Sequence, residues 1–186
     1  MRVLIAILAL IVAAPAAWAA PAPAWVVDKA ASSIRFSSSF NGDAFSGGFS
    51  RWDADIHFDP ANLAGSAVSV TIDAASAATG DADRDQALPT PKFLSAAKFP
   101  RAAFTAHSFK ALGGGKFVAA GQLSLRGVTR PLALPFTLAI AGDRARMNAS
   151  LPLDRLAFGV GQDEWRATSA LPAAVNVSIV VTARRH

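Results

Sequence analysis

Few side chains in this sequence could carry out acid–base, nucleophilic or metal chemistry. The 186 residues contain no Cys and only three His, at positions 57, 107 and 186. No two of them have the i, i+2 or i, i+4 spacing that puts two metal ligands on one face of a strand or helix. The absence of Cys excludes thiol catalysis, Cys-ligated metal centres and disulfides. We therefore interpret the histidines as surface residues and predict no metal site.

One acidic cluster, Asp81, Asp83 and Asp85, resembles the start of a calcium-binding loop. Such a loop needs Gly at its sixth position and Glu at its twelfth, where this chain has Gln86 and Lys92. Asp also accepts hydrogen bonds from the free N–H groups at the start of a helix. The favoured interpretation is that these aspartates cap short helical turns.

Hydrolytic sites are also missing from the sequence. Ser is plentiful, but there is no Gly-x-Ser-x-Gly motif and no His is placed to activate a Ser. A glycosidase needs two inward carboxylates, whereas Asp53 and Asp55 fall on the polar face of their strand and Asp73, Asp154 and Glu164 lie near strand ends. The sequence predicts a protein that is not an enzyme.

The elements that must position these side chains are strands. Apolar and polar residues alternate along most of the chain, and this period of two indicates strands with one buried face. Turn residues such as Asn41-Gly42-Asp43 and Gly113-Gly114-Gly115 separate the runs. Only residues 81–97 break the pattern, and they predict one or two short helical turns. The runs are 34–40, 45–58, 68–72, 117–125, 132–140, 147–153 and 175–181.

The connections between runs are short, which makes neighbouring strands antiparallel because a parallel crossover needs a dozen or more residues. Half-apolar strands can close into a barrel or stack as a sandwich. Gly47 and Gly48 in a long strand, together with 12 Phe and 4 Trp, favour a barrel. A barrel of about eight strands is just wide enough for one small ligand. Alternation alone does not distinguish a cavity from a packed interior.

The N-terminus predicts export to the periplasm. Met1-Arg2 precedes the apolar run 3–14, and Ala17-Trp18-Ala19 has the small-x-small pattern of a cleavage site. The run is shorter than the ~20 residues of a membrane span. We expect a signal peptide over residues 1–19, a Pro/Ala lead-in over 20–24 and one domain over 25–186. The net charge of +5 is scattered along the chain, so no nucleic-acid partner is expected.

Five segments, taken in order, resemble the YceI-like family of exported bacterial proteins. They are 25–28 with 33–36, 48–49 with 56–60, 84–104 (matched as the family's internal helical segment), 121–131, and 155–161. The resemblance implies an all-β, antiparallel, eight-stranded lipocalin-like barrel with a short helical insertion. It also implies an elongated hydrophobic pocket for a polyisoprenoid or similar lipid chain, quinone-like or prenyl-phosphate-like. Many members carry His where this chain has Ala31 and Phe40, so no head-group role is transferred to those positions.

The predicted function is binding of a long apolar lipid in the periplasm, for sequestration or transport, with no cofactor required. Arg84 and Arg155 are candidates for contact with a lipid head group. The favoured interpretation, however, pairs Arg84 with Asp81 or Asp85, and Arg155 with Asp154 or Asp163. The candidate ligand-binding residues, each also compatible with a structural core, are Phe36, Phe40, Ile56, Phe58, Leu123, Leu125, Phe136, Leu138, Met147 and Val177.

An alternative function belongs to a different class. Residues 161–165 resemble a branch of the family associated with cytochrome b561. In that hypothesis the protein is an accessory partner of a membrane redox complex, acts through its outer surface and has a filled barrel core. Transient contact with a membrane and a homodimer are both left open by the sequence.

Overall fold

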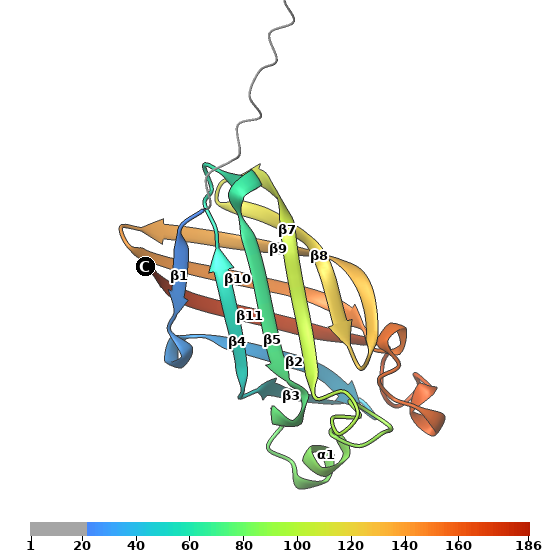
Figure 1. Cartoon of the computed structure of the whole chain (residues 1–186). Coiled ribbons are helices and arrows are strands. Elements are labelled where there is room, and N and C mark those ends of the chain that lie inside the picture. Colours follow the sequence, from blue (N-terminus) through green and yellow to red (C-terminus); the bar gives the residue numbers. More distant parts are fainter. Residues whose placement is uncertain (1–21) are drawn as a thin grey trace, which may run out of the picture.

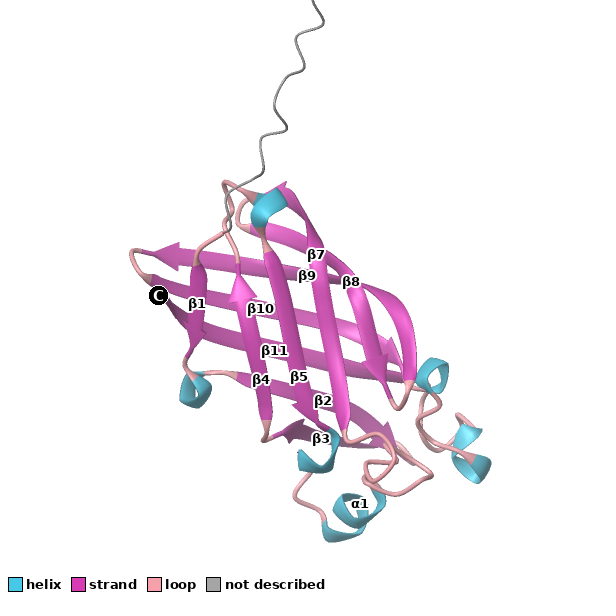
Figure 2. Cartoon of the chain, viewed as in Figure 1, coloured by secondary structure: helices cyan, strands magenta, loops and turns pink. Residues whose placement is uncertain are grey.

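The computed structural model describes residues 22–186, which form eleven strands and one short α-helix (Figures 1 and 2). None of the helices in this range is long and apolar enough to cross a membrane. The elements are β1 (Ala24–Val27), β2 (Ser33–Phe40), β3 (Asp43–Phe49), β4 (Trp52–His57), β5 (Ala67–Asp73), β6 (Ala77–Ala78), α1 (Ala82–Ala87), β7 (Arg101–Gly113), β8 (Lys116–Leu125), β9 (Val128–Ala141), β10 (Arg144–Asp154) and β11 (Ala174–Arg185).

The predicted signal peptide, residues 1–19, lies outside the described residues, as do the first two residues of the predicted lead-in. The rest of the lead-in is part of the fold. The amide of Ala22 donates to the carbonyl of Gly65 at 3.1 Å, and the amide of Phe58 donates to the carbonyl of Pro23 at 3.2 Å. Since β1 starts at Ala24, the described domain begins ahead of residue 25.

All of the strands join one antiparallel sheet in the order β1-β4-β5-β7-β8-β9-β10-β11-β2-β3-β6, and pairing between β1 and β11 closes it. β1 and β2 are two parts of the first strand of the barrel, β3 and β4 of the second, and β5 and β6 of the third. The result is a closed barrel of eight strands with one short helix, which confirms the predicted fold class.

The first three barrel strands are broken at the same level. A 3-10 turn over Lys29–Ala31 interrupts the first, residues 50–51 the second, and a 3-10 turn over Ala74–Ser76 the third. We call this line of breaks, residues 28–32, 50–51 and 74–76, the crease. The sequence predicted an unbroken strand over 45–58, and that prediction is wrong at residues 50–51.

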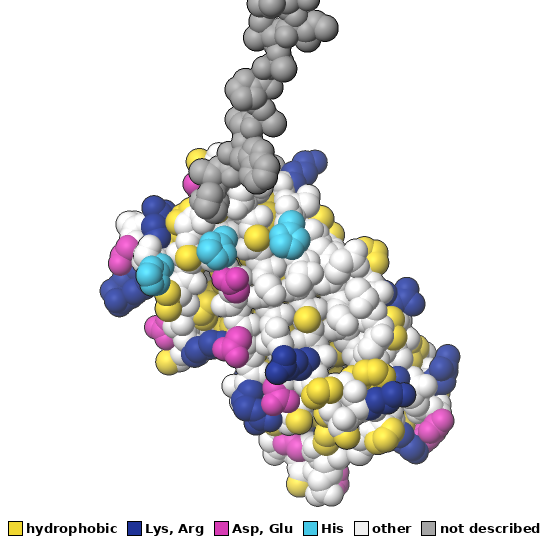
Figure 3. Space-filling model, in the orientation of Figure 1, with side chains coloured by type: hydrophobic (Ala, Val, Ile, Leu, Met, Phe, Trp, Pro, Cys, Tyr) yellow, Lys and Arg dark blue, Asp and Glu magenta, His cyan; other side chains and the backbone are white. Residues whose placement is uncertain are grey.

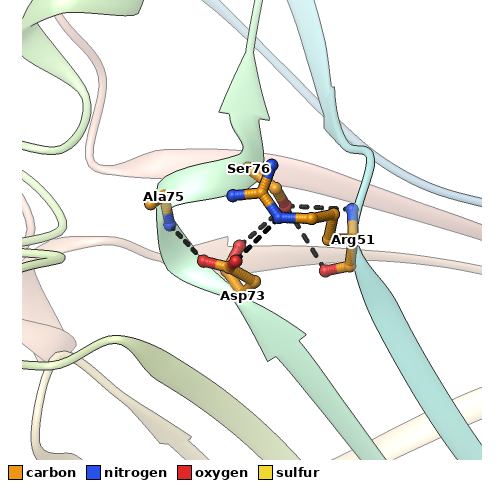
Figure 4. Close-up of polar contacts among 4 residues, drawn as sticks. All are labelled: Arg51, Asp73, Ala75 and Ser76. Carbon is orange, nitrogen blue, oxygen red and sulfur yellow. Dashed lines mark hydrogen bonds and ion pairs between the residues drawn. The ribbon is translucent and has the colours of Figure 1, made fainter.

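Hydrogen bonds to Ser76 explain the break in the second strand (Figure 4). The amide of Arg51 donates to Ser76 Oγ at 3.1 Å, and the amide of Ser50 donates to the Ser76 carbonyl at 3.3 Å. Ser76 Oγ in turn contacts the Arg51 carbonyl at 3.3 Å. These groups are therefore not available for a regular ladder.

The other five strands, β7 to β11, are continuous and have 10 to 14 residues each. The alternating pattern did not predict β7, and Phe104 was assigned to a helical segment. Phe104 instead lies in β7, with its side chain buried in the barrel. Alternation in β7 is weak because many of its residues are Ala, Ser or Thr, which carry little hydrophobic signal.

Apolar side chains fill both ends of the barrel. At the end opposite α1, which we call the upper end, the ring of Phe58 lies 5.2, 5.5 and 5.8 Å from the rings of Phe109, Phe117 and Phe136. At the lower end, which carries α1, residues at and below the level of the crease pack with the insertion 79–100. That lower cluster consists of Ala74, Ala77, Leu94 and Ala96, with Phe36, Phe49, Leu88, Leu125 and Val160 against it.

The insertion is held by the aspartates that resemble a calcium loop. Asp81 Oδ1 accepts from the amide of Arg84 at 3.0 Å and caps α1. The carboxylate of Asp85 accepts from the amide and hydroxyl of Thr79, at 2.6 and 2.8 Å, and from the amide of Gly80 at 3.1 Å. The capping interpretation is confirmed for Asp81, and Asp85 fixes the segment before the helix.

Replacement of Asp85 by Ala is expected to destabilise the protein in a pH-dependent manner. The hydrogen bonds from Thr79, and to a lesser degree the one from Gly80, hold the pKa of the Asp85 carboxyl below its usual value. A lowered folded pKa stabilises the fold above the unfolded pKa of about 3.9, and this contribution is lost as the pH falls through the folded value. The melting temperatures of wild type and Asp85→Ala should therefore differ at pH 7 and converge below pH 4. A difference that persists unchanged at pH 3 would contradict this account.

Candidate functional site: an apolar cavity inside the barrel

The barrel encloses a cavity of about 180 Å³. Its 25 lining residues are all apolar and come from β1, β2, β4, β5 and β7 to β11, together with Phe58 just after β4. This composition follows from strand geometry, because alternate residues of each strand point to the same side of the sheet. The inward face of each strand is apolar, and the outward face carries the Ser, Thr, Asp and Arg residues.

The exposure of inward residues shows that the interior is not close-packed. Among the described residues no large side chain is less than 2% exposed. Ile56, Met147, Val177 and Ile179 point into the barrel, yet each is only half-buried. A protein interior at normal packing density would leave such side chains no accessible surface. The accessible surface of these side chains faces the cavity.

The cavity offers no group for catalysis. No titratable, hydroxyl or amide side chain lines it, and most backbone groups of its wall are paired in the sheet. An unpaired polar group would be costly to bury there. The cavity can therefore bind only apolar ligands, or the apolar part of a ligand, favourably. It is smaller than the ~300–1,000 Å³ of a typical small-molecule site, so the barrel must widen to take more than a short stretch of a lipid chain.

Seven of the ten candidate ligand-binding residues line the cavity. They are Ile56, Phe58, Leu123, Phe136, Leu138, Met147 and Val177. Their contact with a ligand stays a prediction, but the structure brings them together on one apolar wall. Three large aromatic residues outside the candidate set also line the cavity: Trp25, Trp52 and Phe104. For Trp52 the signal was present, since it starts the alternating run that contains Ile56.

The other three candidates lie below the cavity. Phe36 and Leu125 pack in the lower cluster, where the Phe36 ring is 5.6 Å from the ring of Phe49. The Phe36 ring also occupies the space where a Cβ of residue 47 would be, which explains Gly47. Phe40 lies outside the barrel interior, with its ring 5.7 Å from Trp165. None of the three lines the cavity, since Phe36 and Leu125 pack in the lower cluster and Phe40 packs against Trp165. Their contact with a ligand stays a prediction.

Arg84 lies at a separate pocket of about 350 Å³ between α1 and the β2–β3 hairpin. Its guanidinium is 3.2 Å from Asp81 and lies 5.2 Å from the ring centre of Phe45. This is the predicted pairing with Asp81. The ion pair is half-exposed, and its position beneath the lower cluster keeps it away from the cavity.

Arg155 is 3% exposed and binds backbone carbonyls. Its Nε donates to Pro172 at 2.9 Å, Nη1 to Val160 at 2.9 Å, and Nη2 to Leu171 at 2.8 Å and Ala167 at 3.5 Å. Burial lowers the pKa of the guanidinium, and the charge of Asp154 acts in the opposite direction.

The predicted ion pair of Arg155 with Asp154 or Asp163 is therefore corrected. The loop that carries Arg155 turns back on itself, and its carbonyls accept from four of the five N–H groups of the guanidinium. Arg155 holds this loop, and its burial keeps the guanidinium out of reach of a lipid head group.

The histidines lie on the outer surface, where Lys and Arg side chains are interspersed with Asp and Glu (Figure 3). His57 Nε2 is 3.2 Å from Asp55, and both residues lie on the polar face of β4. Within residues 22–186 no three His, Asp or Glu side chains come together in a manner that could hold a metal ion.

Comparisons of this chain with a family model, with curated relatives and with solved structures agree with one another. A model of the YceI-like domain matches residues 25–183. A UPF0312 protein of Vibrio vulnificus is 36% identical over 138 residues, which cover 73% of this chain and 72% of the relative. The crystal structure of BcnA from Burkholderia cenocepacia superposes with a TM-score of 0.81 at 29% identity and covers 84% of this chain and 98% of BcnA.

A more distant structure has the same fold. It is described as a polyisoprenoid-binding domain from Saccharophagus degradans implicated in plant cell wall breakdown. It matches with a TM-score of 0.69 at 18% identity, over 88% of this chain and 99% of that domain.

Proposed function

Since this chain belongs to the YceI-like family, we propose that it binds a long apolar lipid, an isoprenoid or quinone-like chain, inside its barrel in the periplasm. The observation that carries the proposal is the cavity lined only by apolar side chains. The fold shared with a polyisoprenoid-binding domain supports the same ligand class. The signal peptide predicted over residues 1–19 supports export.

The physical driving force is the removal of apolar surface from water. Each 100 Å² of ligand surface buried contributes about 2.5 kcal/mol, against several kcal/mol lost on association. A ligand must therefore bury several prenyl units to bind tightly. A short apolar molecule that only fills the 180 Å³ cavity gains less than a chain that widens the barrel.

Binding is expected to strengthen with the length of the prenyl chain. Purified protein, titrated with the alcohols geraniol, farnesol and geranylgeraniol, should show falling dissociation constants along the series, measured by calorimetry. Native mass spectrometry should detect an apolar molecule on protein extracted gently from the periplasm. If none of the three alcohols binds and repeated preparations show a single ligand-free mass, the proposed lipid binding is wrong.

The alternative function required a filled barrel core, and the cavity does not agree with that requirement. A partner such as cytochrome b561 stays a prediction, independent of the cavity. No feature of the described surface favours it over lipid binding.

A further inference from the structure

The barrel wall has a seam at the crease, between its first and second strands. β1 pairs with β4 only at Ala24–His57 and Trp25–Ile56. Pairing resumes between β2 and β3 at Ile34–Phe49. Between these two points, residues 26–33 and 50–55 face each other without a backbone ladder.

A lysine side chain bridges the seam in place of strand hydrogen bonds. Lys29 Nζ donates to the carbonyl of Trp52, a group that in a closed wall would bond to the neighbouring strand. The same ammonium is 3.1 Å from Asp53 Oδ1 and lies 3.9 Å from the centre of the Trp52 ring. Side-chain contacts of this kind can part and re-form without disturbing the sheet on either side.

Two side chains separate the cavity from the outside at the seam. Ile34 and Trp52 line the apolar cavity, and they also line a groove of about 730 Å³ on the outer face of the crease. Both are buried, at 5% and 9% exposure. The ends of the barrel are less direct routes. Phe58 and the three Phe rings around it fill the upper end, and the lower cluster fills the lower end.

The groove is cationic. Lys29, Arg35 and Arg51 line it against one carboxylate, that of Asp53. Arg51 Nε is 2.8 Å from Asp73 Oδ2, and the bonds drawn in Figure 4 leave its two terminal nitrogens unused.

Arg35 provides the second guanidinium of the groove. It is exposed on β2, and its hydrogen bond to Ser46 Oγ is long, at 3.4 Å. Guanidinium groups with free donors are suited to phosphate oxygens. Ser33 and Ser50 supply hydroxyl groups beside them.

We propose that lipids enter the cavity through this seam and that the groove holds an anionic head group, a phosphate or diphosphate. The chain passes between Ile34 and Trp52 into the cavity, and the head group stays outside with Arg35 and Arg51. This inference rests on the proposed function and specifies its ligand: a prenyl phosphate is preferred over a neutral lipid with the same chain.

The test compares two ligands that differ only at the head, geranylgeranyl phosphate and geranylgeraniol. Wild-type protein should bind the phosphate about tenfold more tightly, as expected for one charge-assisted contact. Arg35→Gln should lose most of this preference and bind the alcohol as wild type does. Arg35→Lys should keep part of it. The matched control is Arg144→Gln, an exposed arginine of β10 outside the groove, which should behave as wild type.

The outcomes separate the two proposals. Equal affinity of wild type for both lipids, or an equal loss of preference in Arg144→Gln and Arg35→Gln, overturns the head-group site and leaves lipid binding intact. Failure of both lipids to bind overturns the proposed function itself.

The route is tested by dissociation rates of the alcohol. Trp52→Leu at the seam should release it several-fold faster than wild type. Phe58→Leu at the upper end, a cavity-lining control, should change the rate less. A larger acceleration in Phe58→Leu would place the route at the end of the barrel and contradict the seam.

Discussion

A phenylalanine at position 54 is expected to prevent lipid binding while the barrel still folds. Ala54 lies on the inward face of β4 between Trp52 and Ile56, opposite Val70, and lines the cavity. A ring at this position projects into a space of about 180 Å³ and occupies the volume that a prenyl chain needs. Insertion of extra groups into a close-packed core costs about 1–3 kcal/mol. The cost should be at the low end here, because the ring enters an existing void.

The control is the same substitution on the outer face. Ala120 lies on β8 with its side chain exposed, so Ala120→Phe adds an identical ring without entering the cavity. Calorimetric titration with geranylgeraniol should show at least a tenfold weaker affinity for Ala54→Phe and no change for Ala120→Phe. Both variants should melt cooperatively. Wild-type affinity in a folded Ala54→Phe variant would mean that the lipid does not occupy this cavity.

Replacement of Arg155 by Met is expected to lower the free energy of unfolding more than any other substitution proposed for this protein. The guanidinium is almost fully buried and serves four carbonyls, those of Val160, Ala167, Leu171 and Pro172. Each buried acceptor left without a donor costs about 1–3 kcal/mol, although some of these carbonyls will regain water. We expect a loss of about 3 kcal/mol, measured as the free energy of unfolding in urea.

Arg84→Met is the matched comparison. Arg84 lies in α1, and its ion pair with Asp81 is half-exposed. Exposed pairs contribute about 0–1 kcal/mol. Limited proteolysis should cut Arg155→Met within residues 156–173, where wild type and Arg84→Met resist. If the two methionine variants lose equal stability, the carbonyl contacts of Arg155 are not what holds this loop.

The barrel could be predicted because the alternation of apolar and polar residues within each strand can be read from the sequence alone, and it determines which face of the strand must be buried. Ile56, Met147 and Val177 each lie in a run of period two, and strands with one apolar face and short connections have few ways to bury it. Seven candidate residues lie on the cavity for this reason. Their periodicity identified the face they share without any knowledge of the neighbouring strands.

What the sequence could not predict depends on contacts between distant segments. Phe36 has the same periodicity as Ile34, yet it packs against Phe49 in the lower cluster, since the insertion covers that end. The aspartates beside Arg155 suggested an ion pair, but the guanidinium binds carbonyls of a loop that folds over it. No periodic signal marks a backbone carbonyl as an acceptor. The crease is equally hidden, because it forms where breaks in three strands coincide.

The crease also divides the wall into two mechanically different parts. The long strands β7 to β11 form a plate of successive ladders, in which β9 and β10 pair at residues 136–141 and 144–149. Below the crease, β2, β3 and β6 form a small flap that is attached to the plate through β11, while β6 pairs only with β3. Such a flap can swing on its attachment to β11 if it gives up its packing in the lower cluster and the hydrogen bond from the Asn41 amide to the Ala170 carbonyl. Bending the plate would break strand ladders instead. Expansion of the barrel around a larger guest is therefore assigned to one hinged side of the wall, and the opposite side serves as its fixed frame.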